Sequence, residues 1–136
     1  MWRFALTSSP KDPNAPVVAI DFDGVIVEEA WPAIGPPIPL AAEAIRALDA
    51  AGYWIIVNTS READQPTGQD ALAYLATVGI PFDAYNVNLP HRIARFGGDA
   101  RKISADLYVD DRNFPGGFDG WASVFEALGL PVPVAA

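Results

Sequence analysis

Two aspartates follow a short apolar run near the start of the chain, in the sequence VVAIDFDG at residues 17–24. One residue separates Asp21 from Asp23, so on an extended backbone their side chains lie on the same side. Two carboxylates this close repel each other, and a hard divalent cation such as Mg²⁺ removes that repulsion. The pair therefore indicates either a magnesium site or two solvated aspartates where a strand meets a turn.

Further polar residues carry groups that suit phosphoryl chemistry. Thr59 and Ser60 follow a second apolar run, and Asp110 and Asp111 follow a later one. An aspartate beside Mg²⁺ can attack phosphorus, and a second carboxylate can protonate the leaving oxygen. A hydroxyl such as that of Thr59 and an ammonium such as that of Lys102 stabilise charge on phosphoryl oxygens. Taken singly, a turn cap for Thr59 and an exposed surface position for Lys102 are the simpler interpretations.

The elements that must position these residues alternate between strands and helices. Apolar runs predict strands at residues 17–22, 53–57, 82–87 and 106–109, and amphipathic stretches predict helices at residues 40–51, 66–78 and 121–128. Residues 88–101 are ambiguous. The four prolines between residues 25 and 39 exclude a long helix and predict a loop or small hairpin flap. We expect the flap's Trp31, Ile34 and Ile38 to cover the site or to pack against a second subunit.

This alternation predicts a three-layer α/β/α sandwich with a mostly parallel, Rossmann-like sheet and no separate cap domain. The predicted organisation is a loosely held lead-in at residues 1–16, a core at residues 17–130 and a tail at residues 131–136. Ligands of such sheets bind at the carboxyl ends of the strands. The aspartate pairs and the Thr59–Ser60 cluster all fall at such ends.

Composition excludes several classes of function. The 136 residues include no cysteine, which excludes disulfides, thiolate catalysis and cysteine-ligated zinc. Nine basic and 17 acidic residues give a net charge of −8, which argues against non-specific binding to nucleic acid. No apolar run has the length of a membrane span, and the apolar stretch at the N-terminus is too short for a signal peptide. The sequence therefore predicts a soluble cytoplasmic protein with no membrane partner.

The order of the motifs resembles the haloacid dehalogenase (HAD) superfamily of phosphohydrolases. DFDGV, NTSR, a lysine and YVDDR follow the four motifs of that family in order, across residues 17–113. The resemblance implies Mg²⁺ as cofactor and hydrolysis of phosphate monoesters through an aspartyl-phosphate. It implies that Asp21 is the nucleophile and a metal ligand. It also implies that Asp23 is the general acid and base and binds the metal through its backbone carbonyl.

The remaining site residues follow from the same resemblance. Thr59 matches the hydroxyl of the second motif, and Lys102 matches the lysine of the third, with Arg101 beside it as an alternative. Of the closing pair, Asp111 is expected to bind the metal, with Asp110 supporting it. Ser60 and Arg61 are expected to bind the substrate. From its position alone, Arg61, like Arg112, either binds a second anionic group, makes a structural ion pair or is exposed at the surface.

Asp23 and the spacing of the motifs indicate which subtype of the HAD superfamily the chain resembles. Relatives that cleave carbon–halogen bonds lack the second aspartate, so Asp23 favours phosphate esters. Neither residues 24–58 nor residues 60–102 leave room for a folded cap. Capless members of the family act on large or exposed substrates or close their site by forming an oligomer. The expected partners are thus a phosphorylated substrate of undetermined class and, in the second case, a copy of the same chain.

Two rival interpretations come from other classes of protein. A receiver domain of a signalling relay also places aspartates, a hydroxyl and a lysine around Mg²⁺, but in that family the acidic pair comes first and the lysine last. Here the Asp-x-Asp motif comes first and the pair Asp110–Asp111 comes last, after Lys102, which disfavours a receiver. The other rival is a binding or regulatory protein that keeps the fold with little or no turnover.

Overall fold

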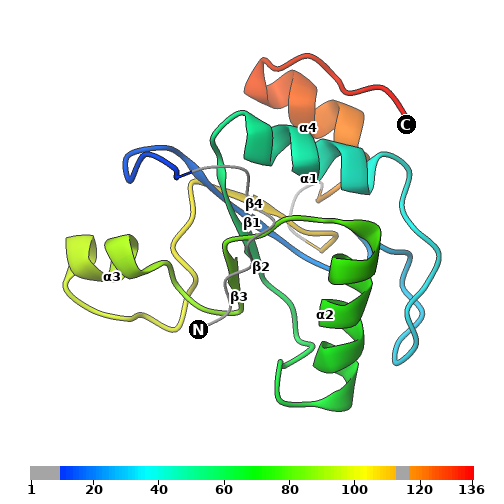
Figure 1. The fold of residues 1–136 in the computed structure, drawn as a ribbon, viewed down its shortest axis with the longest axis horizontal. Helices are drawn as coiled ribbons and strands as arrows, with labels where there is room; N and C mark the ends of the chain where they lie inside the picture. Colours follow the sequence, from blue (N-terminus) through cyan, green and yellow to red (C-terminus); the bar gives the residue numbers. More distant parts are fainter. Residues whose placement is uncertain (1–9, 113–116) are drawn as a thin grey trace.

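A four-stranded parallel sheet forms the centre of the molecule (Figure 1). The computed structural model describes residues 10–112 and 117–136. The strands are β1 (Val17–Ile20), β2 (Trp54–Val57), β3 (Ala84–Tyr85) and β4 (Leu107–Val109), and their order across the sheet is β3-β2-β1-β4. Ile20 lies opposite both Val57 and Val109, so β1, β2 and β4 end at the same level. Polar residues that follow these strands are thereby brought to one edge.

Four helices accompany the parallel sheet in the described part of the chain, which confirms the predicted α/β fold. One face packs against α1 (Ala41–Ala50), α2 (Pro66–Val78) and α4 (Trp121–Leu128). The short α3 (Pro90–Phe96) lies apart from these three helices, and Leu89, just before it, packs on the opposite face (Figure 1). The described residues form no separate cap domain.

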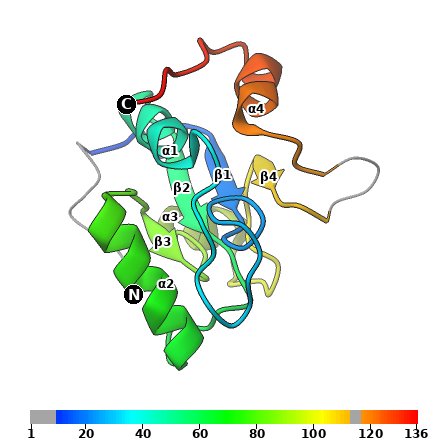
Figure 2. The same cartoon turned by 90° about the vertical axis from the view of Figure 1, so that its right-hand side faces the viewer.

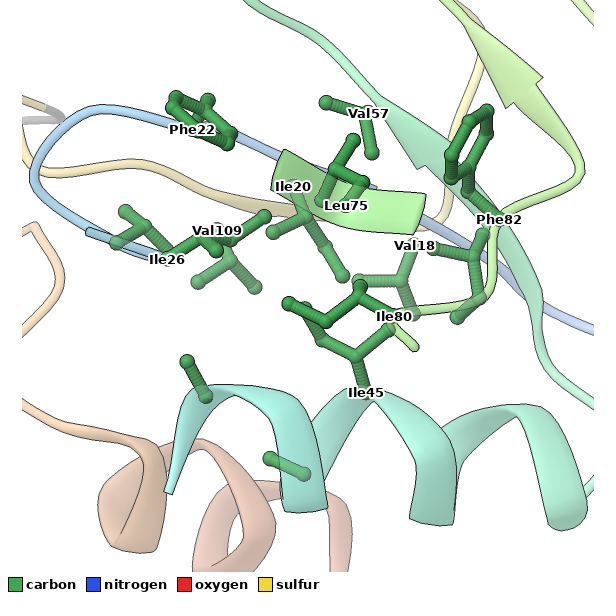
Figure 3. Packing of buried hydrophobic residues seen from close by; sticks show 14 of the residues in the cluster. Val18, Ile20, Phe22, Ile26, Ile45, Val57, Leu75, Ile80, Phe82 and Val109 are labelled. Carbon is green, nitrogen blue, oxygen red and sulfur yellow. The ribbon is translucent and has the colours of Figure 1, made fainter. Parts of the chain in front are cut away.

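The main core lies between the sheet and the three helices. Val18 and Ile20 of β1 point into it, and Ile45 of α1 and Leu75 of α2 meet them there (Figure 3). All four side chains are fully buried. Burial of each such side chain contributes about 1.5–3 kcal/mol, so this core anchors β1 and with it the aspartates that follow.

The predicted elements largely match the observed ones, with one helix missed. The predicted helices at residues 66–78 and 121–128 coincide with α2 and α4, whereas β3 is much shorter than the predicted strand. The ambiguous stretch holds α3, in which Pro90 is the first residue and Gly97 follows the last. A proline at the first position and a glycine after the end are ordinary helix signals, so α3 was predictable from sequence.

The described part of the lead-in is held more firmly than expected. The Lys11 side chain is 3% exposed, and its Nζ lies 2.7 Å from carboxylate oxygens of both Asp49 and Asp83. The indole of Trp54 donates a hydrogen bond to the carbonyl of Asp12 at 2.7 Å. A buried ammonium needs such partners, which the sequence around Lys11 does not reveal because they lie far along the chain. Residues 1–9 lie outside the described residues.

The flap, which we define as residues 25–39, is a small hairpin-like excursion after β1. It lies between α2 and β4 in Figure 2. The Glu28 N–H bonds the Pro36 carbonyl at 2.8 Å, and the Ile38 N–H bonds the Ile26 carbonyl at 3.0 Å. Ile34 and Ile38 pack against the main core, which corrects the expectation that they cover the site or a second subunit. The flap is therefore rooted in the core, whereas its tip at residues 28–33 and the three prolines of its returning limb are exposed.

The described residues contain no helix long and apolar enough to cross a membrane.

Candidate active site

The candidate site lies at the carboxyl ends of β1 and β4, where the chain stops adding strands on one side of β1 and adds the next strand on the other side. From β1 the chain adds β2 and β3 on one side, and it then crosses to place β4 on the other side. Open α/β sheets bind ligands beside the carboxyl ends of the strands at such a change in strand order. Asp21 follows β1, and its backbone N–H donates to the Val109 carbonyl of β4 at 2.9 Å. Asp110 and Asp111 follow Val109 directly, so the two aspartate pairs meet at this edge.

A polar cavity of about 710 Å³ occupies this edge. Six of the predicted site residues line it: Asp21, Asp23, Thr59, Ser60, Asp110 and Asp111. Glu29 and Trp31 of the flap also line it, together with Asn58 and Arg112. The fold thus brings the polar ends of β1, β2 and β4 together around one space.

Asp21 is the most perturbed carboxyl group of the cavity. Burial raises its pKa from 3.8 to about 7, although a hydrogen bond from the Phe22 N–H opposes the rise. The negative charges of Asp111 and Asp110 raise the pKa further, as does a side-chain hydrogen bond with Asp111. A carboxyl group that is disfavoured as an anion by neighbouring carboxylates lies where a cation can relieve the repulsion.

Gly24 makes room for the Asp111 carboxylate. A Cβ atom at residue 24 would lie 2.2 Å from Oδ2 of Asp111 and 2.7 Å from its Cγ. The backbone of Gly24 also has φ +85°, which non-glycine residues rarely adopt. Glycine is therefore required here for two independent reasons, and the close approach places the Asp111 carboxylate beside the turn that follows Asp21.

The donor set fits Mg²⁺ held by few protein ligands. No group of three or more histidine, cysteine, aspartate or glutamate side chains in the described part of the chain is arranged to hold a metal. Mg²⁺ commonly binds one or two carboxylates and keeps several waters, so the Asp21–Asp111 pair is sufficient in number. Asp110 lines the same cavity, where its Oδ1 accepts the Arg112 N–H at 3.0 Å.

The Asp23 carboxylate is paired with Arg61. Its Oδ2 accepts a hydrogen bond from Nε of Arg61 at 2.7 Å, and its Oδ1 accepts one from Nη2 at 2.8 Å. The Arg61 side chain is fully buried, and the bond to Asp23 raises the pKa of its guanidinium. Arg61 does not line the cavity. Of the interpretations of Arg61, the structural ion pair is the one that the structure contains, and the expected contact with a substrate stays a prediction.

Thr59 is held in place by β3. Its backbone N–H donates to Oδ1 of Asn86 at 2.7 Å, and its Oγ1 accepts the Arg61 N–H at 3.2 Å. Asn86 has φ 57°, a left-handed conformation that asparagine tolerates better than most residues. The Thr59 hydroxyl hydrogen remains available for a ligand in the cavity. Sequence reasoning missed Asn86, because it lies inside the strand predicted at residues 82–87.

The predicted cation Lys102 lies outside this cavity. It is exposed, and its Nζ is 5.2 Å from the centroid of the Tyr108 ring. Arg112, by contrast, lines the cavity and is also exposed. The structure thus brings Arg112 to the aspartates, whereas the role expected of Lys102 stays a prediction.

Trp31 stands at the rim of the cavity. Its side chain is 53% exposed, and its ring centroid lies 5.0 Å from the guanidinium carbon of Arg61. Its backbone N–H donates to Oε2 of Glu29 at 2.8 Å. An exposed tryptophan at a polar cavity offers a flat apolar surface to a ligand.

Comparison with known proteins gives a relative without a described activity. No protein-family model matches the chain, and neither does any curated protein. A solved structure of a conserved protein from Bacteroides thetaiotaomicron is similar, with a TM-score of 0.74 and 34% sequence identity. The similarity covers 85% of this chain and 91% of that one. This chain therefore belongs to the same family as the conserved Bacteroides thetaiotaomicron protein.

Proposed function

We propose that this protein is a Mg²⁺-dependent phosphohydrolase of the HAD type, which cleaves phosphate monoesters through an aspartyl-phosphate. The observation that supports this most strongly is the pairing of Asp21 with Asp111 at the ends of adjacent strands. Their closeness and the raised pKa of Asp21 create a place where a divalent cation relieves repulsion. The surrounding cavity of about 710 Å³ has room for a phosphoryl group and its leaving group.

In the proposed reaction, Asp21 is the nucleophile. Its carboxylate forms a bond to phosphorus while the bond from phosphorus to the leaving oxygen breaks, and Asp23 supplies the proton to that oxygen. A water then attacks phosphorus, Asp23 accepts the water's proton, and inorganic phosphate departs as Asp21 is restored. Mg²⁺, held by Asp21, Asp111 and the Asp23 backbone carbonyl with Asp110 nearby, would neutralise phosphoryl charge and so favour attack by an anion.

Other residues of the cavity fit supporting roles. The Thr59 hydroxyl and the Arg112 guanidinium are the donors available to the phosphoryl oxygens, where charge spreads in the transition state. Ser60 lines the same cavity and is proposed to contact the substrate. Lys102 is proposed to join them when a phosphorylated ligand is bound. A cytoplasmic location and closure by a second copy of the chain belong to the same proposal.

The alternative is a binding or regulatory protein that has this site but little or no turnover. A single assay separates the two. The purified protein is incubated with para-nitrophenyl phosphate in Mg²⁺ and, in parallel, with a chelator. We expect hydrolysis that depends on Mg²⁺ and stops with the chelator. Absence of hydrolysis at high enzyme concentration would support the alternative.

A further inference from the structure

Arg61 uses every N–H of its guanidinium in the structure. Nε and Nη2 bind the two oxygens of Asp23, at 2.7 and 2.8 Å. The three remaining N–H groups have carbonyl partners. Nη2 donates to Ala33 at 2.8 Å, and Nη1 donates to Pro32 at 3.1 Å and to Thr67 at 3.3 Å. A fully buried arginine with five hydrogen bonds has one permitted orientation.

Two of these carbonyls belong to the tip of the flap. Pro32 and Ala33 lie directly after Trp31, the residue at the rim of the cavity. The guanidinium therefore bridges the flap and the carboxylate of Asp23. Since one rigid planar group makes both sets of bonds, a shift of the flap carbonyls alters the plane in which Asp23 is held.

We propose that Arg61 is a positioning residue, which fixes the orientation of the Asp23 carboxylate and makes that orientation depend on the flap. This inference rests on the proposed function, in which Asp23 delivers a proton to the leaving oxygen. The flap then has a second role beyond contact with the leaving group. A leaving group that displaces Trp31 and the following carbonyls changes the position of the proton donor at the same time.

The first test keeps a positive charge at residue 61 but removes the planar guanidinium that binds both oxygens of Asp23. Arg61→Lys retains a cation but cannot bind both oxygens of Asp23 in one plane. We expect kcat to fall about 10- to 100-fold while KM changes by less than about threefold, because a misplaced catalytic group affects the transition state more than the ground state. Arg46→Lys is the matched control, since Arg46 is exposed and, among the described residues, donates hydrogen bonds to the carbonyls of Val78 and Gly79, away from the cavity.

A comparison of leaving groups separates positioning from a merely structural role. Departure of an alkoxide needs the proton from Asp23, whereas para-nitrophenolate departs without it. Arg61→Lys should therefore reduce kcat/KM, which reports the steps up to departure of the leaving group, more for an alkyl phosphate than for para-nitrophenyl phosphate. Equal losses of kcat/KM on both substrates, or a change in KM alone, would overturn the proposal.

The second test moves the flap without substituting any residue that lines the cavity. A Cβ atom at Gly35 would lie 2.1 Å from the carbonyl oxygen of Glu28, so Gly35→Ala must separate the two limbs of the flap. We expect the same selective loss on alkyl phosphates as for Arg61→Lys. Gly98→Ala is the control, because nothing lies within 4 Å of a Cβ atom there. This test also decides the matter if Arg61→Lys fails to fold.

A measurement that needs no turnover keeps this inference distinct from the proposed function. In a ¹H–¹⁵N spectrum the Nε–H of Arg61, buried against Asp23, should exchange slowly with solvent and should shift in Asp23→Asn. If the flap sets Arg61, Gly35→Ala shifts the same signal and Gly98→Ala does not. An unchanged Arg61 signal in folded Gly35→Ala would overturn the inference even in an active enzyme. An inactive wild type with the expected signals would reject the proposed function alone.

Discussion

The carboxylate of Asp111 rests against the backbone of Gly24, so closely that a Cβ atom at residue 24 would lie 2.2 Å from its Oδ2. The contact joins the turn after β1 to the end of β4. It places Asp111 close enough to Asp21 to raise the pKa of the Asp21 carboxyl group. The geometry of the aspartate pair thus depends on a residue that has no side chain of its own.

Gly24→Ala should damage both stability and the metal site. The new methyl group must displace Asp111, and the backbone at φ +85° is strained for alanine. We expect a loss of about 1–3 kcal/mol in the free energy of unfolding, measured by urea denaturation. Stabilisation by Mg²⁺ should be lost as well. Gly98→Ala, which meets no neighbour and has no positive φ, is the control; equal effects of the two substitutions would contradict the close approach.

Stability without metal should depend on pH through Asp21. The folded protein keeps this proton up to about pH 7, whereas the unfolded chain releases it near its ordinary pKa of 3.8. The unfolded state therefore binds fewer protons between these values, and the contribution of Asp21 to stability falls as pH rises from about 4 to about 7.

Asp21→Asn isolates this contribution, because asparagine still accepts the Phe22 N–H and does not titrate. In a chelator, the variant should gain stability relative to wild type on going from about pH 5 to about pH 8. Chemical denaturation at the two pH values measures the difference. If the difference in stability between Asp21→Asn and wild type is the same at both pH values, the pKa of Asp21 is not raised.

Mg²⁺ should stabilise the folded protein, because it binds the acidic pair and not the unfolded chain. At a concentration about 100 times Kd the gain is about 2.7 kcal/mol, visible as a higher Tm. Asp111→Ala should abolish the gain, and Asp110→Ala should reduce it less. Asp64→Ala, a change at an exposed aspartate away from the cavity, should leave it intact. If Asp110→Ala instead loses more of the Mg²⁺ stabilisation than Asp111→Ala, Asp110 is the metal ligand and Asp111 the supporting residue, and the site itself stands.

Much of the fold and of the candidate site is readable from the sequence. The apolar runs fix the strands, and the polar residues directly after them fall at the same edge because parallel strands end together. This is why the meeting of Asp21 with Asp110 and Asp111 was predictable. The close approach of Asp111 was not, because it depends on a loop conformation at Gly24.

Side-chain partners far apart in sequence escape the same reasoning. Nothing around Arg61 shows that its guanidinium binds Asp23 and not a substrate, since 38 residues separate the two. Lys11 has the ordinary appearance of a surface lysine, yet two buried carboxylates hold it. The same lack of local signal explains why Lys102 was placed with the site on resemblance alone.

Trp31→Ala should change substrate preference more than stability. The side chain is 53% exposed, so its loss should cost less than about 1 kcal/mol, mainly the contact with Arg61. We expect KM to rise for a bulky aryl ester such as naphthyl phosphate and to change little for a compact one. Phe96→Ala is the matched control, because Phe96 is exposed and lines a different cavity. Unfolding of Trp31→Ala would instead make the flap tip structural.

The central claim is that Asp21 is the nucleophile of a Mg²⁺-dependent phosphohydrolase. The most direct measurement compares Asp21→Asn and Asp23→Asn with wild type, by rate of phosphate release in Mg²⁺ and by intact-protein mass after exposure to substrate. We predict that folded Asp21→Asn releases no phosphate and gains no mass. Asp23→Asn should be severely slowed and should retain one phosphoryl group, because its second step lacks a base. Phosphate release by purified Asp21→Asn at the wild-type rate would contradict the account.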